Sequence, residues 1–138
     1  MTTQVYNSLL TPQSIVTGTC KLTSSNAGGY DVPTNAVQLL AAQPNGARIT
    51  RVQATPGATT VAGDVELYAY NGSNYRHIKT VAIAAQTITP GSNTAAVNPY
   101  DFGYSDSNPI LLSSTESLFM ALSVAQTAIE GRCEGGAY

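Results

Sequence analysis

The sequence is poor in the residue types on which most enzyme chemistry depends. Among 138 residues there are one histidine, two cysteines, six lysines and arginines and eight aspartates and glutamates, so only 10% of the residues are charged. In a typical globular domain about a quarter of the residues are charged. Few general acids, general bases or metal ligands are therefore left to build a catalytic site. We expect a protein that is not an enzyme and that holds no metal and no cofactor.

The low charge and the absence of long apolar runs exclude further classes. A formal net charge of −2 gives no basic surface for nucleic acid. No apolar run approaches the roughly 20 residues of a membrane-spanning helix. The first five residues, Met-Thr-Thr-Gln-Val, lack the basic and apolar stretches of a signal peptide. We expect a protein that is made in the cytoplasm and binds neither nucleic acid nor a membrane.

Apolar residues recur instead with a period of two in short runs, separated by glycine, proline and asparagine. This pattern is typical of half-buried β-strands joined by turns. We predict strands at residues 15–22, 37–42, 48–54, 65–70, 75–83, 94–97, 110–112, 117–124 and 128–133, and a long exposed loop at 98–109. About eight strands at this spacing predict an all-β fold, a two-sheet antiparallel sandwich of the jelly-roll or Greek-key type.

The chain has the length of one domain, and neither a linker nor an internal repeat divides it. Residues 1–13 are predicted to form an extended N-terminal arm, and residues 14–138 a single sandwich domain. Within the strand at 48–54, Ile49 and Val52 would fall on opposite faces if the strand were regular. We expect a β-bulge there that turns both side chains inward.

The clearest local unit is a hairpin at residues 65–83. Asn71 and Gly72 begin the connection between its two arms and readily adopt the positive backbone dihedrals of a tight turn. Tyr70 and Tyr75 then lie opposite each other as an aromatic cross-strand pair.

Polar residues on the strands are interpreted as surface. Asp64 and Glu66 alternate with apolar residues on the first arm of the hairpin, which places both on the polar face of that strand. We expect a solvated or subunit-facing surface there, not a pair of catalytic acids. His77, the single histidine, is expected to be a surface or interface residue, because no motif of a nucleophile or a metal site accompanies it.

Tyrosine is frequent, with eight residues, whereas tryptophan is absent. Six of the tyrosines fall into two predicted clusters: Tyr68, Tyr70 and Tyr75 at one end of the hairpin, and Tyr100, Tyr104 and Tyr138 in a second patch. Such clusters are typical of protein interfaces and of sugar-binding faces. Because sugar-binding platforms are commonly built on aromatic stacking and tryptophan is lacking, protein contact is favoured over carbohydrate.

Two cysteines lie in the first and the last predicted strand. In the cytoplasm the thiols of Cys20 and Cys133 begin reduced, and two buried free thiols are the simplest interpretation. If the two side chains face partner subunits instead, they would oxidise after release from the cell and cross-link an assembly. Both alternatives stay open.

The hairpin and the C-terminal segment resemble short jelly-roll structural proteins of tailed bacteriophages. The resemblance covers roughly residues 35–138 and is carried by Arg-Ile-Thr-Arg-Val-Gln-Ala at 48–54, by Gly-Asp-Val-Glu-Leu-Tyr-Ala-Tyr-Asn-Gly-Ser-Asn-Tyr at 63–75, by a leucine-rich strand, and by Glu-Gly-Arg-Cys-Glu-Gly-Gly-Ala-Tyr at 130–138. Where members of this family often end in Gly-Gly-Asp and an aromatic residue, this chain has Gly-Gly-Ala-Tyr. No catalytic residue carries over from the family.

The resemblance implies a component of the virion, and it favours a capsid decoration (cement) protein that binds and stabilises the outer surface of a phage head. The implied partners are the major capsid protein and further copies of the chain, in a homotrimer inferred from capsid geometry. The N-terminal arm would drape over a neighbour. A neck, collar or tail component of the same virion is the first alternative. A carbohydrate-binding module for host attachment is the second.

Overall fold

The computed structural model describes residues 11–89, 91 and 99–138 of the chain. These residues form nine strands and no helix, so this part of the chain has no helix that could cross a membrane. The strands are β1 (Ser14–Leu22), β2 (Val37–Leu40), β3 (Ala47–Pro56), β4 (Gly63–Tyr70), β5 (Tyr75–Ile83), β6 (Tyr100–Asp101), β7 (Ile110–Leu112), β8 (Ser117–Leu122) and β9 (Ile129–Ala137).

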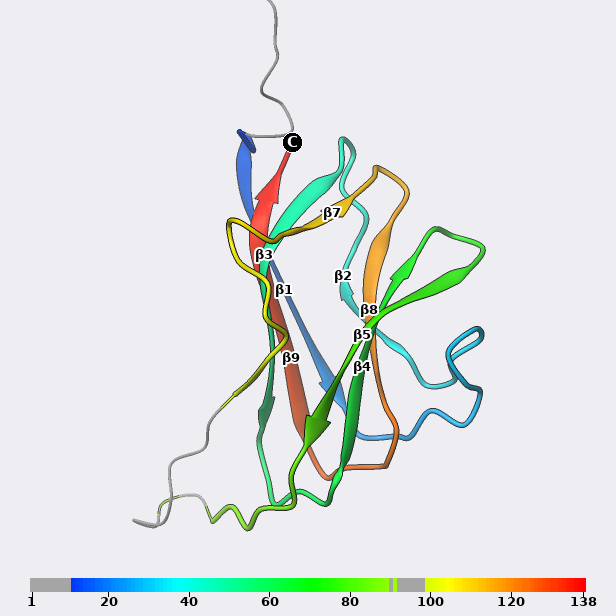
Figure 1. Cartoon of the computed structure of the whole chain (residues 1–138), viewed down its shortest axis with the longest axis vertical. Helices are drawn as coiled ribbons and strands as arrows, with labels where there is room; N and C mark the ends of the chain where they lie inside the picture. Colours follow the sequence, from blue (N-terminus) through cyan, green and yellow to red (C-terminus); the bar gives the residue numbers. More distant parts are fainter. Residues whose placement is uncertain (1–10, 90, 92–98) are drawn as a thin grey trace, which may run out of the picture.

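The strands form two sheets that face each other (Figure 1). The first sheet has the order β1-β9-β3-β6, with β7 also paired to β3, and the second has the order β2-β8-β4-β5. The antiparallel pairs are nested: β4 with β5, then β3 with β6 and β7, then β2 with β8, and finally β1 with β9. A long hairpin rolled into two sheets in this way is a jelly roll, which confirms the predicted fold class.

The core lies between the sheets and is built from alternate residues of the strands. Leu118, Met120 and Leu122 on β8 are fully buried, and they face buried residues of β3 and β9 such as Val52 and Ile129. Because successive side chains of a strand point to opposite faces, one face of each strand supplies this core and the other face forms the exterior.

The predicted bulge in β3 is confirmed. Ile49 and Val52 are both fully buried, and the register of β3 against β9 shifts between Ile49 and Arg51. Gly135 lies opposite this shift, where a Cβ atom would overlap the carbonyl oxygen of Arg48 and lie 2.8 Å from the Cα atom of Ile49. The bulge therefore needs a residue without a side chain on β9.

The predicted hairpin is confirmed as β4 and β5, with Tyr70 paired to Tyr75. The turn differs in one respect, because only Gly72 has a positive φ, 95°. Asn71 contributes through its side chain instead. Its Oδ1 accepts hydrogen bonds from the N–H groups of Ser73 and Asn74 at 2.9 and 2.8 Å.

The segment predicted as a loop at 98–109 is partly structured. Tyr100 and Asp101 form β6 against β3, and Phe102, which follows them, is fully buried. The N–H of Phe102 donates a hydrogen bond to the carbonyl oxygen of Val52 at 2.9 Å. The largely polar sequence around Phe102 conceals a strand that is anchored by the fully buried Phe102 and by Tyr100, which packs against the core.

The ends of the predicted strands change by a few residues. β2 ends at Leu40 and β8 at Leu122, whereas β9 continues beyond residue 133 to Ala137 because it pairs with both β1 and β3. The strand predicted at 94–97 and residues 1–10 of the predicted arm lie outside the described residues. The rest of the arm already joins the first sheet, since the N–H of Gln13 donates to the carbonyl oxygen of Ala137 at 2.7 Å.

Candidate functional site

The charged residues gather on the outer face of the first sheet. This face carries four of the six basic residues and three of the eight acidic ones: Lys21, Arg48, Arg51, Arg132, Asp101, Glu130 and Glu134. The strand alternation of β1, β3 and β9 turns these side chains away from the core. Half of the fourteen charged residues therefore lie on this one face, and fewer lie on the strands of the second sheet.

The charges on this face largely satisfy one another. Glu134 accepts from Arg51 at 3.3 Å and from Arg132 at 3.4 Å, and Arg48 lies 3.7 Å from the carboxylate of Asp106. All of these pairs are partly open to solvent. Surface ion pairs of this kind contribute about 0–1 kcal/mol each to stability.

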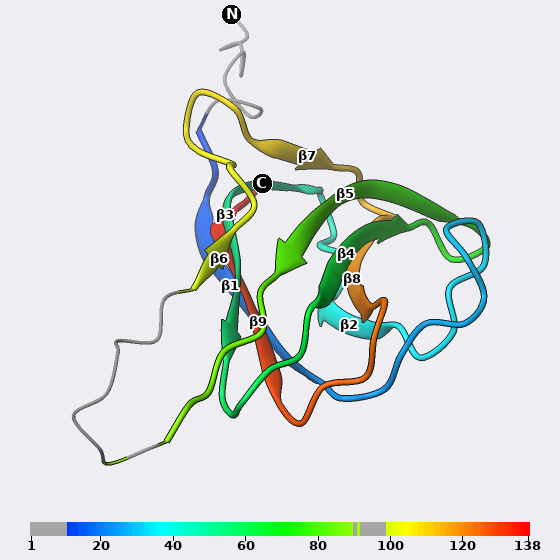
Figure 2. The ribbon, with the colours of Figure 1, turned by 60° about the horizontal axis from the view of Figure 1, so that its bottom comes forward.

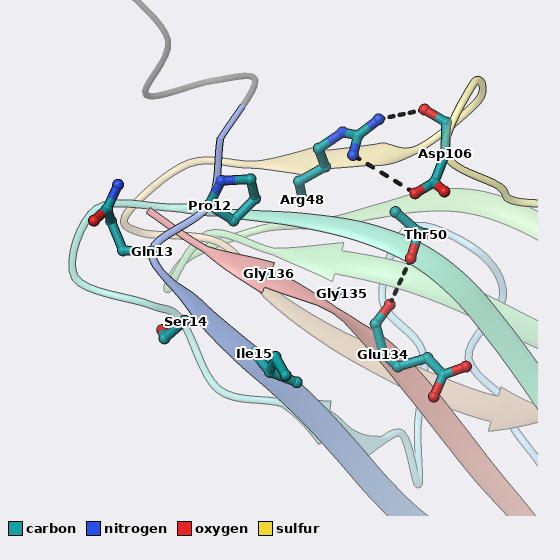
Figure 3. A pocket seen from close by; sticks show the side chains of 10 residues that line it. All are labelled: Pro12, Gln13, Ser14, Ile15, Arg48, Thr50, Asp106, Glu134, Gly135 and Gly136. Carbon is teal, nitrogen blue, oxygen red and sulfur yellow. Dashed lines mark hydrogen bonds and ion pairs between the residues drawn. The ribbon is translucent and has the colours of Figure 1, made fainter. Parts of the chain in front are cut away.

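A groove of about 450 Å³ lies at one end of the same face (Figure 3). Pro12 and Ile15 form one wall, and Arg48, Thr50 and Glu134 lie across it. Arg48 also donates a hydrogen bond to the carbonyl oxygen of Asp106. This groove holds no histidine or cysteine, and no group of acidic, histidine or cysteine residues in the described part of the chain is arranged to hold a metal ion.

The outer face of the second sheet is aromatic. The rings of Tyr70 and Tyr75 lie 4.3 Å apart, and each lies 5.5 Å from the ring of Phe119 on β8. The two contacts with Phe119 are edge-to-face, at 72° and 86°, which is a favoured geometry for aromatic pairs. All three side chains are half-buried. We call Tyr70, Tyr75 and Phe119 the aromatic face.

A segment between β1 and β2, residues 23–36, lies against the same sheet beside the hairpin (Figure 2). We call it the strap. Asn26 of the strap donates through Nδ2 to Glu66 Oε1 at 2.9 Å and to the hydroxyl of Tyr68 at 3.3 Å. Tyr30 of the strap stacks on the ring of His77 at 4.1 Å.

The strap corrects two sequence-based expectations. Tyr68 is fully buried and Glu66 is 5% exposed, so neither lies on a solvated surface and Tyr68 is no longer a candidate interface residue. The hydroxyl of Tyr68 donates to Glu66 Oε1 at 2.7 Å. Burial, followed by the hydrogen bond to Glu66, raises the pKa of Tyr68 well above its ordinary value.

The second predicted tyrosine patch is not formed. The hydroxyl of Tyr100 accepts hydrogen bonds from Ala84 N–H at 3.2 Å and from Gln86 Nε2 at 2.9 Å, and both Tyr100 and Tyr104 pack against the core. Tyr138 lies beyond the other end of β3, where its N–H donates to the carbonyl oxygen of Gly46 at 3.1 Å. Tyr138 therefore lies in a different region of the molecule from Tyr100, and the three tyrosines form no common patch.

Both thiols are free and both belong to the inner face of the first sheet, where Cys20 is opposite Gly131 and Cys133 is opposite Gly18. Cys133 is fully buried and so cannot meet a partner subunit. Desolvation by burial raises the pKa of Cys20 to about 11 and that of Cys133 to about 12. The geometry therefore favours two free thiols, one half-buried at Cys20 and one buried at Cys133, over the cross-linking alternative.

His77 has the environment of a structural residue. Its Nε2 lies 2.7 Å from the hydroxyl of Thr80, and its ring contacts those of Tyr30 at 4.1 Å and Tyr68 at 5.5 Å. In the described part of the chain no hydrogen bond joins it to a carboxylate. This arrangement does not orient His77 as a general base.

Three residues of this region were not anticipated from the sequence: Asn26, Tyr30 and Phe119. The alternation of β8 did hold the signal for Phe119, since its neighbours Leu118 and Met120 belong to the core. No sequence signal indicated Asn26 or Tyr30, because a strap without periodicity does not show which face it covers.

The aromatic face is the candidate functional site. It combines large half-exposed rings in contact with one another, whereas the arginines of the charged face are already engaged in ion pairs. Comparisons of this chain with protein-family models, with curated proteins and with solved structures return no match.

Proposed function

We propose that this protein is a virion structural protein, a capsid decoration (cement) protein that binds and stabilises the outer surface of a phage head, and that the aromatic face is its docking surface. The observation that carries the proposal is the contact of three half-buried rings on the outside of one sheet, at 4.3 to 5.5 Å. Aromatic side chains are enriched among the residues that dominate protein–protein binding energy.

The surroundings of the aromatic face favour a protein partner. Arg76 and Glu116, which adjoin Tyr75 and β8 in sequence, form an ion pair at 3.0 Å with the arginine side chain 66% exposed. A centre of aromatic residues with charged residues at its margin is the common composition of a protein interface.

The fold and the low charge are consistent with a structural role. A jelly roll is the fold that the family resemblance implies, and many copies with few charges can pack closely with little mutual repulsion. The proposed assembly is a homotrimer at the threefold positions of the head, in contact with the major capsid protein.

The test is the binding of the purified full chain to heads that lack it. Tyr75→Ala and Phe119→Ala should each weaken binding at least about tenfold, the factor expected for loss of an interface anchor. Tyr104→Ala, the same kind of truncation outside the aromatic face, is the matched control and should bind normally. Circular dichroism of each variant shows whether its fold is kept. Unchanged occupancy for the two variants of the aromatic face would contradict the proposed docking surface.

Copy number separates a head protein from a neck, collar or tail component. A decoration protein occupies the whole head lattice, whereas a neck or tail component forms one small ring. Imaging of intact particles that carry a labelled chain distinguishes the two distributions.

A carbohydrate-binding module is the second candidate function, and one observation favours it. A polar groove of about 470 Å³ on the first sheet brings Tyr104 together with Arg51, Gln53 and Asp101, a mixture of one aromatic ring and several hydrogen-bonding groups that suits a sugar. Glycan-array binding that is lost in Tyr104→Ala but kept in Tyr75→Ala would support this function.

A further inference from the structure

We infer that Asn71 is a site of spontaneous deamidation, at which the tip of the β4–β5 hairpin gains a carboxylate without the action of an enzyme. Asn71 and Gly72 are adjacent and both exposed. The reaction requires only water. The backbone nitrogen of Gly72 is the nucleophile, and the side-chain amide of Asn71 is the group that it attacks.

The first step is a ring closure. The backbone nitrogen of Gly72 gives up its proton to hydroxide, and its electron pair forms a bond to Cγ of Asn71. The bond between Cγ and Nδ2 breaks, and Nδ2 leaves as ammonia after it takes up a proton from water. The product is a five-membered succinimide. Water then adds to one of the two ring carbonyl carbons, the bond between that carbon and the Gly72 nitrogen breaks, and the nitrogen takes up a proton. Opening at Cγ gives aspartate at position 71, and opening at the backbone carbonyl carbon gives isoaspartate.

Two backbone donors favour attack at Cγ. The N–H groups of Ser73 and Asn74 both donate to Oδ1 of Asn71, at 2.9 and 2.8 Å. They polarise the side-chain carbonyl in the starting state. Donors that are already in place stabilise the negative charge that develops on such an oxygen when a nucleophile adds to the carbonyl carbon.

The attacking nitrogen is also accessible. The N–H of Gly72 donates no hydrogen bond in the described part of the chain. Gly72 is exposed, and no heavy atom lies within 4 Å of the position that a Cβ atom would occupy. The hydroxide that must remove its proton can therefore approach. Rotation of the Asn71 backbone toward the ring geometry disturbs only the bonds of the tip itself, such as Asn71 N–H to Asn74 O at 3.2 Å.

The chain offers an internal comparison in the same dipeptide at Asn45 and Gly46. Gly46 also has a positive φ, 85° against 95° at Gly72. In contrast to Gly72, Gly46 is buried, and its N–H donates to the carbonyl oxygen of Gln43 at 3.0 Å. The attacking nitrogen of this second dipeptide is therefore hydrogen-bonded and shielded from solvent. Although both sites have the same Asn-Gly sequence, we expect deamidation in the folded protein to be slower at Asn45 than at Asn71.

The product changes the margin of the aromatic face. An aspartate at position 71 still accepts the two N–H groups through a carboxylate oxygen. An isoaspartate adds an atom to the backbone and disturbs the pairing of Tyr70 with Tyr75. An effect on docking rests on the proposed function, whereas the deamidation itself does not.

The test follows the folded full chain during incubation at mildly alkaline pH, with peptide mapping by mass spectrometry at both dipeptides. Asn71 should convert at least about tenfold faster than Asn45, the factor that corresponds to one hydrogen bond of ordinary net strength at Gly46. In concentrated urea the two rates should converge, since the structural difference is then lost. Equal rates in the folded chain, or a faster reaction at Asn45, would overturn the inference.

The same samples separate this inference from the proposed function. Deamidated protein that binds heads as well as fresh protein would argue against a role of the hairpin tip in docking and would leave the modification site established. Absence of conversion at Asn71 would overturn the modification site alone.

Discussion

Glu66 and Tyr68 occupy alternate positions of β4 on the outside of a sheet, yet both are buried. Their hydrogen bond of 2.7 Å, together with that from Asn26 to Glu66 at 2.9 Å, ties the strap to the second sheet. A buried polar group that loses its partner costs more free energy than the bond itself contributes. Removal of the Tyr68 hydroxyl therefore tests how much these hydrogen bonds of the strap contribute to stability.

Tyr68→Phe removes this hydroxyl and leaves Glu66 and Asn26 short of a partner. We expect the free energy of unfolding to fall by about 1–3 kcal/mol, as measured by urea denaturation. Tyr70→Phe is the matched control, because no hydrogen bond of its hydroxyl is present in the described part of the chain. Equal effects of the two variants would show that the hydroxyl of Tyr68 does not anchor the strap.

The thiols give a prediction about reactivity. Because the thiolate is the reactive form and burial raises the pKa to about 11 at Cys20 and about 12 at Cys133, alkylation of the folded protein near neutral pH should be slow. Cys133 should be the slower of the two, since it is fully buried. Iodoacetamide labelling followed by mass spectrometry measures both rates, and rapid labelling of Cys133 without unfolding would contradict this description.

The same pKa shifts predict a loss of stability in alkali. The folded thiols keep their protons above the ordinary pKa of 9.0, whereas the thiols of the unfolded chain ionise there. Their contribution to stability is therefore complete below about pH 9 and is lost as the pH rises toward 11 and 12. Urea denaturation at a series of pH values should show this decline, with a shallower slope in Cys133→Ser. A slope that is the same in both proteins would exclude Cys133 as its cause.

At the scale of elements, β3 and β9 depend on each other through the bulge. In Gly135→Ala the new Cβ would meet the backbone of Arg48 and Ile49, which cannot move without breaking the ladder. We expect a loss of about 1–3 kcal/mol in the free energy of unfolding.

Gly57→Ala is the control for this variant. A Cβ at position 57 meets its nearest neighbour, the Cβ of Ala128, at 3.4 Å, an ordinary contact. Urea denaturation should therefore place Gly57→Ala close to the parent protein and Gly135→Ala well below it. A Gly135→Ala variant as stable as Gly57→Ala would mean that the bulge can relax.

Elements in which apolar and polar residues alternate regularly could be predicted from the sequence. Elements that are held by a few contacts with distant parts of the chain could not. The hairpin of β4 and β5, the bulge at Ile49 and the inward row of β8 follow from the spacing of apolar residues. β6 and the strap have no such spacing, because β6 is held by Phe102 and the strap by Asn26 and Tyr30. Contacts between residues far apart in the chain leave no local pattern.

At the scale of the whole molecule, β9 is an interior strand of the first sheet and joins β1 to the rest of that sheet. It pairs with β1 along nine residue pairs and also with β3. A chain that ends before Ile129 would leave β1 without a partner strand, would leave β3 paired only to the short strands β6 and β7, and would remove the buried side chains of Ile129 and Cys133 from the core. We expect this truncated chain to lack cooperative unfolding in circular dichroism and to show poor dispersion in its NMR spectrum. A cooperative transition in the truncated chain would contradict a central role of β9.

The candidate site, too, could be predicted from the sequence only where its contacts are local. The sequence predicted that Tyr70 and Tyr75 pair, because neighbours across a tight turn are fixed by local geometry. It did not predict that Tyr68 is covered, that Phe119 joins the pair, or that Tyr138 lies far from Tyr100. Each of these depends on which segments the fold brings side by side.

The sequence by itself determined the all-β class and the positions of most strands, through its alternation of apolar and polar residues, and the scarcity of catalytic groups, through its composition. These properties depend only on which residues are present and on their neighbours in the chain. Only the tertiary structure decided that half of the charged residues share the outer face of the first sheet, that Tyr70, Tyr75 and Phe119 meet on the second, and that Glu66 lies beneath a strap. The physical reason is that the solvent exposure of a residue depends on which other segments of the chain pack against it. A strand has an outer face by its own geometry, but whether that face meets water depends on what else the chain folds against it.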